Sequence, residues 1–98
     1  MPSLPCVSVI IPTYNRVQLL KQAVISVLQQ TYQNFEIIII NDGSTVNIFE
    51  SVHNLDSRIK VIKQKHSGSG NARNLGIQYA RGKYVAFLDD DDIFMPDK

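Results

Sequence analysis

Four consecutive isoleucines, at positions 37–40, constrain the fold more than any other feature of this 98-residue chain. They belong to an apolar run, FEIIII at 35–40, in which apolar and polar residues do not alternate. Continuous apolar strands are typical of parallel sheets, because helices cover both faces of such a sheet. The run is far too short for a membrane span, which needs about 20 residues. We therefore expect a buried strand in a parallel sheet.

Further strand and helix patterns alternate along the chain. Short β-branched runs predict three more strands, at 6–11, 59–62 and 84–88, with Pro12 ending the first. Apolar residues at helical spacing predict helices at 17–28, 46–55 and 72–80. Strands joined by crossovers of this length must be parallel, with right-handed connections. The order predicts a Rossmann-like α/β fold with three α/β/α layers and a mostly parallel central sheet.

Two of these helices carry specific packing expectations. In the helix at 46–55 we expect Ile48, Phe49 and Val52 to face inward. In the helix at 72–80 the apolar spacing places Tyr79 on the buried face, and Gly82 is the expected C-terminal stop.

Composition excludes several classes of protein. The chain has 10 Lys and Arg against 9 Asp and Glu, and its basic residues are scattered, which argues against a nucleic-acid-binding face. A single cysteine, Cys6, forms no internal disulfide, so a reducing compartment such as the cytoplasm is expected. The N-terminus lacks the basic region of a signal peptide. One domain fits this length.

The polar segments gather at one edge of the predicted sheet. Ligands of such folds bind beyond the carboxyl ends of the parallel strands. Four segments follow those ends: residues 12–15, residues 41–44, the loop around Gly68, and the aspartates at 89–92. We therefore expect a ligand site at this edge.

The four aspartates dominate that edge. Residues 89–98 hold five acidic side chains and one basic side chain. In an extended segment Asp89 and Asp91 face the same side, while Asp90 and Asp92 point elsewhere. Such oxygen ligands suit Mg²⁺ or Mn²⁺ bridged to substrate phosphates. The alternative is an exposed acidic turn, in which Asp92 caps a following helix.

Other polar residues at the edge have two interpretations. Asp42 stands where Rossmann-like folds often bind a ribose or base, although Asn-Asp-Gly-Ser at 41–44 is also typical of a turn. Gly68-Ser69-Gly70 could offer backbone N–H groups to a phosphate, as a weak glycine motif. Arg73, in the first turn of the helix, favours an anionic partner. His53 and His66 are expected on the surface.

Taken together, several motifs resemble family 2 of the glycosyltransferases, which has the GT-A fold. They are VSVIIPTYNR at 7–16, SVLQQTYQNFEIIIINDGST at 26–45, ARNLGIQYARGKYVAFLDDDD at 72–92 and IFMPDK at 93–98. The resemblance implies a nucleotide pocket, usually for uridine, lined by Pro12, Thr13 and Tyr14.

The resemblance also assigns the charged residues. It implies that Asp42 binds the base and that Arg73 lies near the nucleotide phosphates. Asp89 and Asp91 correspond to the D-x-D pair, in which Asp91 is the direct ligand of Mn²⁺ or Mg²⁺ and Asp89 lies near the ribose and the metal waters. Departures from the family pattern are Asn41, Val46 and Asp90, and Asp90 has no assigned role.

The implied activity is metal-dependent transfer, with inversion, from a nucleotide-diphosphate sugar, most often a UDP-sugar, to the hydroxyl of a saccharide, lipid or protein acceptor. The resemblance places the acceptor site and the general base downstream of the D-x-D segment. We therefore expect residues 1–98 to be the N-terminal nucleotide-sugar-binding part of a catalytic domain truncated there, with no catalytic residue of its own. The expected location is the cytoplasm, including the cytoplasmic face of a membrane.

Three other classes remain open from the sequence. A nucleotidyltransferase would show a glycine-rich, basic loop after the first strand, where this chain has PTYNR. A haloacid dehalogenase-type phosphotransferase needs its Asp-x-Asp motif after the first strand, and here the aspartates follow the fourth. A non-enzymatic module that binds nucleotide or metal is the third. The oligomeric state is not predicted.

Overall fold

A computed structural model describes residues 5–90, and its core is a four-stranded parallel sheet. The strands are β1 (Val7–Thr13), β2 (Phe35–Asp42), β3 (Ile59–Gln64) and β4 (Tyr84–Phe87), in the order β3-β2-β1-β4. The helices are α1 (Val17–Leu28), α2 (Ile48–Val52) and α3 (Ser69–Tyr79). The predicted α/β fold and parallel pairing are confirmed.

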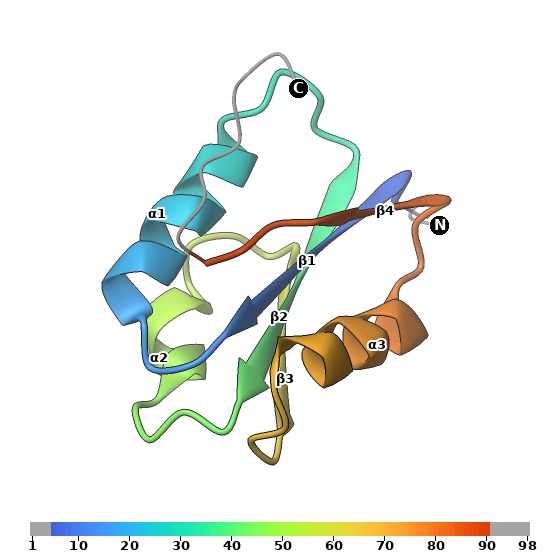
Figure 1. Ribbon diagram of the computed structural model, residues 1–98. Helices are drawn as coiled ribbons and strands as arrows, with labels where there is room; N and C mark the ends of the chain where they lie inside the picture. Colours follow the sequence, from blue (N-terminus) through green and yellow to red (C-terminus); the bar gives the residue numbers. More distant parts are fainter. Residues whose placement is uncertain (1–4, 91–98) are drawn as a thin grey trace.

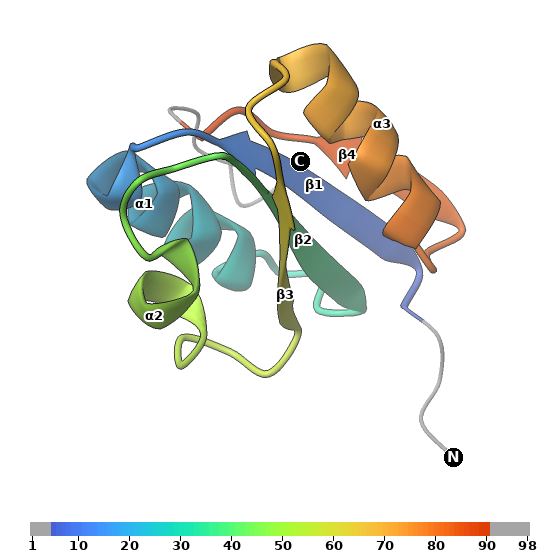
Figure 2. The same ribbon diagram turned by 90° about the horizontal axis from the view of Figure 1, so that it is seen from below.

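Helices cover both faces of the sheet, as the isoleucine run predicted. In Figures 1 and 2, α1 and α2 lie on one face and α3 on the other. Ile37 and Ile39 pack toward α1 and α2, whereas Ile38 and Ile40 pack in the cluster that includes Ala72 of α3. Every residue of β2 is buried. The strand is therefore the centre of two separate apolar cores.

Strands β2 and β3 each run two residues beyond their predicted ends, and β1 passes through Pro12. Asp42 pairs in register with Gln64, so the polar ends extend the ladder. The Leu88 N–H donates to the Ile10 carbonyl. The backbone N–H and C=O groups of even-numbered β1 residues therefore point toward β4. Because β4 ends opposite Ile10, the missing N–H of Pro12 removes no ladder bond.

Three packing predictions are wrong. Phe49 is 52% exposed, because α2 has only five residues and its buried side is formed by Ile48 and Val52. Tyr79 is 50% exposed, at the last residue of α3. Gly82 does not cap α3, whose C-cap is Ala80; it lies against β1, where a Cβ would stand 2.7 Å from the Ser8 backbone N.

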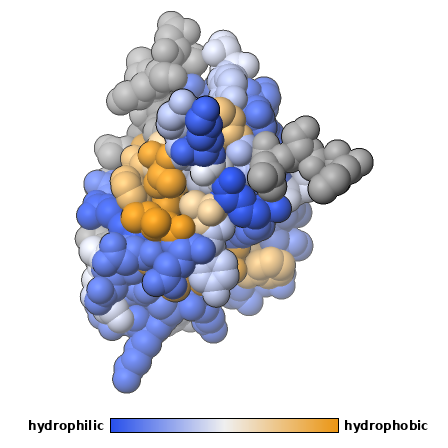
Figure 3. Space-filling view, turned by 90° about the vertical axis from the view of Figure 1, so that its right-hand side faces the viewer, coloured by the Kyte–Doolittle hydropathy of each residue, from blue (hydrophilic) through white to orange (hydrophobic). Residues whose placement is uncertain are grey.

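Strand β4 is one of the two edge strands of the sheet, with β3 at the opposite edge. Its side chains Tyr84, Val85 and Phe87 are exposed, and Figure 3, which views the molecule from this side, shows apolar residues gathered there. None of the described helices is long and apolar enough to cross a bilayer. The two inner strands, β1 and β2, are the buried centre of the sheet.

Candidate functional site

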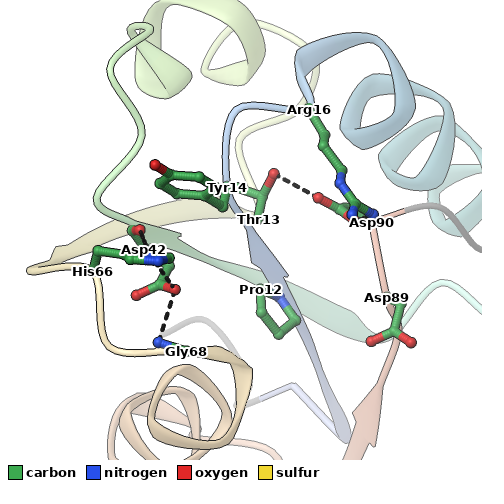
Figure 4. Close-up of a pocket in the computed structure, with 9 residues that line it drawn as sticks. All are labelled: Pro12, Thr13, Tyr14, Arg16, Asp42, His66, Gly68, Asp89 and Asp90. Atoms are coloured by element: carbon green, nitrogen blue, oxygen red, sulfur yellow. Dashed lines mark hydrogen bonds and ion pairs between the residues drawn. The ribbon is translucent and has the colours of Figure 1, made fainter.

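A cavity of about 310 Å³ opens at the carboxyl ends of β1, β2 and β4. It lies where the chain switches from the α1 and α2 face of the sheet to the α3 face, the usual ligand position in open α/β sheets. Figure 4 shows the lining residues, which are Pro12, Thr13, Tyr14, Arg16, Asp42, His66, Gly68, Asp89 and Asp90. The structure therefore brings together five predicted site residues from three strand ends: Pro12, Thr13, Tyr14, Asp42 and Asp89.

Asp42 is the most enclosed carboxylate of the cavity, at 4% exposure. Its Oδ1 accepts hydrogen bonds from Gln64 Nε2 and from the Ser67 N–H, both at 2.7 Å. Its Oδ2 accepts from the Gly68 N–H at 3.0 Å. Burial by itself would raise the pKa of Asp42, but these hydrogen bonds outweigh it and hold the pKa below its ordinary value. Asp42 is ionised at neutral pH.

Of the three backbone N–H groups that the sequence indicated at Gly68-Ser69-Gly70, that of Gly68 is already engaged within the protein. The N–H groups of Ser67 and Gly68 both donate to Asp42. The turn predicted at 41–44 is closed by Asn41, whose Oδ1 accepts from the Ser44 N–H at 2.9 Å. Asp42 instead closes the loop that leads from β3 into α3.

His66 contacts Asp42 and Tyr14 at one side of the cavity. Its Nδ1 lies 3.0 Å from the Asp42 backbone oxygen and 3.1 Å from Asp42 Oδ2. Its ring packs against Tyr14, with ring centroids 4.3 Å apart. The sequence placed His66 on the surface, and its side chain is indeed 59% exposed. The structure adds that His66 lines the cavity.

Asp90 corrects the expected arrangement of the aspartates. It was predicted to point away from the cleft, yet it lines the cavity and is 6% exposed. Its Oδ2 accepts from Thr13 Oγ1 at 2.9 Å, and its Oδ1 is 3.4 Å from Arg16 Nη1. The alternation of side chains fails here because β4 has already ended at Phe87. Asp90 therefore ties the end of β4 to β1.

Asp89 is the accessible carboxylate at the end of β4. Its exposed side chain lines the cavity, and its Oδ1 lies 3.1 Å from Arg73 Nη2. Arg73 does not itself line the cavity, but this contact places a guanidinium beside a cavity carboxylate. Asp91, the predicted metal ligand, lies outside the described residues. The two described aspartates are thus held from opposite sides, Asp89 by α3 and Asp90 by β1.

The donor set fits a cation that takes few protein ligands. Within residues 5–90, no group of three or more His, Cys, Asp or Glu side chains is arranged to hold a metal ion. Asp89 alone presents an exposed carboxylate, since Asp90 is engaged by Thr13 and Arg16. Mg²⁺ and Mn²⁺ sites commonly use one or two carboxylates, with phosphate and water completing the shell. The residues suit that kind of site and not a closed protein cage.

Sequence reasoning missed three cavity residues: Arg16, His66 and Asp90. The clue for Arg16 was its position in the polar turn after the first strand. His66 and Asp90 gave no periodic signal, because both lie in irregular chain after a strand end. Their roles depend on contacts with distant residues, Asp42 and Thr13 respectively.

Comparisons with known proteins agree with this geometry. The family model described as Glycosyl transferase family 2 matches residues 8–98. An uncharacterized glycosyltransferase of Rickettsia felis is 55% identical over 94 residues, covering 94% of this chain and 16% of that protein. The Escherichia coli UDP-Glc:alpha-D-GlcNAc-diphosphoundecaprenol beta-1,3-glucosyltransferase WfgD is 40% identical, covering 94% of this chain and 37% of WfgD.

A solved structure shares the same fold. Staphylococcus aureus TarS 1–349 in complex with UDP superposes with a TM-score of 0.86 at 28% identity, covering 94% of this chain and 29% of TarS. The same protein in complex with UDP-GlcNAc gives a TM-score of 0.83 at 31% identity, with coverages of 90% and 27%. The chain therefore spans well under half the length of these proteins.

Proposed function

Because the chain belongs to glycosyl transferase family 2, we propose that it binds the sugar donor in a glycosyltransferase reaction. The observation that carries the proposal is the convergence of the ends of β1, β2 and β4 on one cavity that contains two buried carboxylates and one exposed carboxylate. WfgD is named for its use of UDP-Glc, and TarS binds UDP and UDP-GlcNAc. We take a UDP-sugar as the donor. Family membership favours this over the nucleotidyltransferase, phosphotransferase and non-enzymatic alternatives.

The proposed donor lies across the cavity with its nucleoside at one side and its diphosphate at the other. Pro12, Thr13, Tyr14 and Asp42 form the nucleoside side. Arg73 and Asp89 form the diphosphate side, since a guanidinium beside the cavity is suited to phosphate oxygens. This division follows the distribution of aromatic and charged side chains around the cavity.

A divalent cation, Mn²⁺ or Mg²⁺, completes the diphosphate side of the proposal. Asp91 would be its direct ligand, with Asp89 beside it. When bound, the cation neutralises charge on the nucleoside diphosphate that departs. Asp90 is not a metal ligand in this proposal. Its carboxylate accepts a hydrogen bond from Thr13 Oγ1 and so anchors the aspartate segment to the end of β1.

We place the acceptor site and the general base in the part of the longer relatives that this chain does not match. In that arrangement an acceptor hydroxyl of a saccharide, lipid or protein attacks the anomeric carbon, with inversion. Residues 1–98 then form the donor-binding part of the catalytic domain. The proposed location is the cytoplasm or the cytoplasmic face of a membrane, in keeping with the single cysteine.

Calorimetric titration with UDP, with and without Mn²⁺, tests the proposal. We expect Mn²⁺ to tighten UDP binding in the wild-type protein, and Asp91→Ala to remove that enhancement. Glu50→Gln is the matched control, because Glu50 is an exposed carboxylate on α2 that does not line the cavity. Absence of UDP binding, or equal Mn²⁺ enhancement in Asp91→Ala, would contradict the proposal.

A further inference from the structure

A second cavity, of about 260 Å³, lies at the amino ends of β2 and β3. This is the opposite end of the parallel sheet from the proposed donor site, and the two cavities share no lining residue. Three cationic side chains line it, those of Arg58, Lys60 and Arg81. One carboxylate, Glu36, lies among them and is 3% exposed. What such a cavity binds depends on which of these charges are already paired.

Arg58 is engaged within the protein. Its Nε and Nη2 each lie 2.9 Å from a carboxylate oxygen of Asp56, and its Nη1 donates to the Gln33 backbone oxygen at 2.7 Å. Its guanidinium lies over the Phe35 ring, 4.2 Å from the centroid. The hydrogen bonds from Arg58 lower the pKa of Asp56 to about 2, so Asp56 is ionised at neutral pH. Arg58 and Asp56 therefore neutralise each other, and Arg58 forms a fixed wall of the cavity.

Lys60 and Arg81 share the remaining acid. Lys60 Nζ lies 3.6 Å and Arg81 Nε 3.4 Å from the same atom, Glu36 Oε1, so the two cations lie side by side. The other oxygen, Oε2, accepts from Ser8 Oγ and from the Arg81 N–H. A single carboxylate balances only one of two cations. Positive charge therefore remains in this cavity, and both oxygens of its carboxylate are occupied.

Several donors of the cavity have no acceptor. Within residues 5–90, Arg81 Nη1 and Nη2 make no hydrogen bond or ion pair, and Lys60 Nζ has no ionic partner besides Glu36. The Ser57 hydroxyl, which belongs to a residue of the same cavity, also makes no hydrogen bond among the described residues. The side chains of Lys60 and Arg81 are 43% and 53% exposed, so a ligand reaches them from solvent.

We propose that this cavity binds the phosphate group of a small phosphate monoester. The planar fork of Arg81 suits two phosphate oxygens at once, and Lys60 and Ser57 supply donors for the third. The volume is close to the lower end of the range for small-molecule sites, ~300–1,000 Å³, which suits a phosphate carrying a small organic group. Such a group belongs either to a soluble ester or to the head group of a lipid. The inference goes beyond the proposed function, because it uses no residue of the donor cavity.

A nuclear magnetic resonance titration of the whole chain with inorganic phosphate, and separately with acetate, tests the inference. Binding is followed through the backbone amides of Ser57, in the cavity, and of Gly82, next to Arg81, so that anions bound elsewhere do not interfere. We expect phosphate to bind about tenfold more tightly than acetate, because acetate has no third oxygen for the further donors. This comparison needs no variant.

Four variants identify the groups that hold the phosphate. Arg81→Gln removes the guanidinium but keeps the backbone N–H that bonds to Glu36, and should lose about tenfold in phosphate affinity. Arg81→Lys keeps the charge without the fork and should fall between that variant and the wild type. Lys60→Gln should lose about threefold. Lys63→Gln is its matched control, because Lys63 is another exposed lysine of β3 that does not line this cavity, and its affinity should stay within about twofold of the wild type.

The inference is wrong if phosphate shifts neither amide in the wild type, or if Arg81→Gln binds phosphate as tightly as Lys63→Gln does. Equal affinities for phosphate and acetate would also overturn it. Sedimentation with phosphatidylcholine vesicles, with and without phosphatidic acid, distinguishes the two sources. Binding that needs both phosphatidic acid and Arg81 supports a lipid head group, whereas phosphate binding without vesicle binding supports a soluble ester. UDP affinity should be the same in Arg81→Gln and the wild type, so failure of this inference leaves the proposed function intact.

Discussion

Strand β2 carries one buried carboxylate at each end, and the two are surrounded differently. Glu36 and Asp42 are 3% and 4% exposed. By the alternation of the strand both lie on the α3 face, on either side of Ile38 and Ile40. Glu36 holds the turn after α3, and Asp42 holds the loop before it. The connection from β3 to β4 is thus fastened at both ends by acids of one strand.

The partners of the two acids differ in kind. Glu36 accepts from Ser8 Oγ at 2.6 Å and from the Arg81 N–H at 2.7 Å, with Lys60 Nζ at 3.6 Å. Burial would raise the pKa of Glu36, but these hydrogen bonds and cations together lower it. Asp42 is held by neutral amides and by His66, inside the cavity. A buried carboxylate that accepts several hydrogen bonds thus fastens the chain at one end of β2 and, at the other end, shapes the proposed ligand site.

Glu36→Ala should give the largest effect on stability. It leaves the Ser8 hydroxyl and the Arg81 N–H without their acceptor and two cations without their counter-charge. We expect a loss of about 3 kcal/mol in the free energy of unfolding, measured by urea denaturation. The exposed control Glu50→Ala should change it by less than about 0.5 kcal/mol. Equal effects in the two variants would remove the structural role of Glu36.

Asp42→Asn should affect ligand binding more than stability. The amide keeps one acceptor oxygen but turns an NH₂ group toward the donors that Oδ1 or Oδ2 now satisfies. We expect a loss of about 1–2 kcal/mol in unfolding free energy and about tenfold in UDP affinity. Glu36→Gln, the same change at the other end, should leave UDP affinity within about twofold. Equal weakening of UDP binding in both variants would contradict the different roles of Glu36 and Asp42.

Acid should weaken both ends of β2 together. The pKa values of Glu36 and Asp42 are lowered in the folded protein from 4.5 and 3.8, so the unfolded chain takes up protons first as the pH falls. The stability that they contribute is present above those ordinary values and is lost as the pH falls through the lower, folded values. Urea denaturation between pH 7 and pH 3 should show this decline. A flatter decline is expected in Glu36→Gln, and parallel profiles would refute the assignment.

Lys60→Met should give the smallest effect. Lys60 Nζ lies 3.6 Å from Glu36 Oε1 and its side chain is 43% exposed, so solvent screens the pair. We expect a loss below about 1 kcal/mol. Ser8→Ala, which removes the short buried hydrogen bond to Glu36, should cost more. If Lys60→Met costs more stability than Ser8→Ala, the ion pair and not the hydrogen bond is the stronger interaction of Glu36.

The sheet was predictable because β2 is a continuous apolar run, the other strands are short β-branched runs, and α1 has a regular apolar stripe. Those patterns depend only on neighbouring residues, so the elements that they predict form as expected. The prediction that Phe49 is buried failed because α2 is one short turn, and the burial of its side chains depends on how that turn packs against α1 and β3. The exposed side of such a helix is not set by spacing.

The sequence predicted where most site residues lie, but not which side chains they contact. Strand ends located Pro12, Tyr14, Asp42 and Asp89 correctly at one edge. The partners of Asp90 could not be inferred, since side-chain alternation stops where β4 stops. His66 depends on the path of an irregular loop, which hydrogen bonds to Asp42 determine. Loop paths of this kind follow from tertiary contacts that no local pattern encodes.

The two apolar cores differ in size, and this has a consequence for motion. Among residues 5–90, twelve buried residues join the sheet to α1 and α2, whereas four form the core beneath α3. The smaller unit opens at a lower free energy, so amide protons in α3 should exchange with solvent sooner than those of α1. Since the loop that carries His66 leads directly into α3, a nucleotide held there would slow exchange along that helix. Occupancy of the cavity would thus be readable from protons that never touch the ligand.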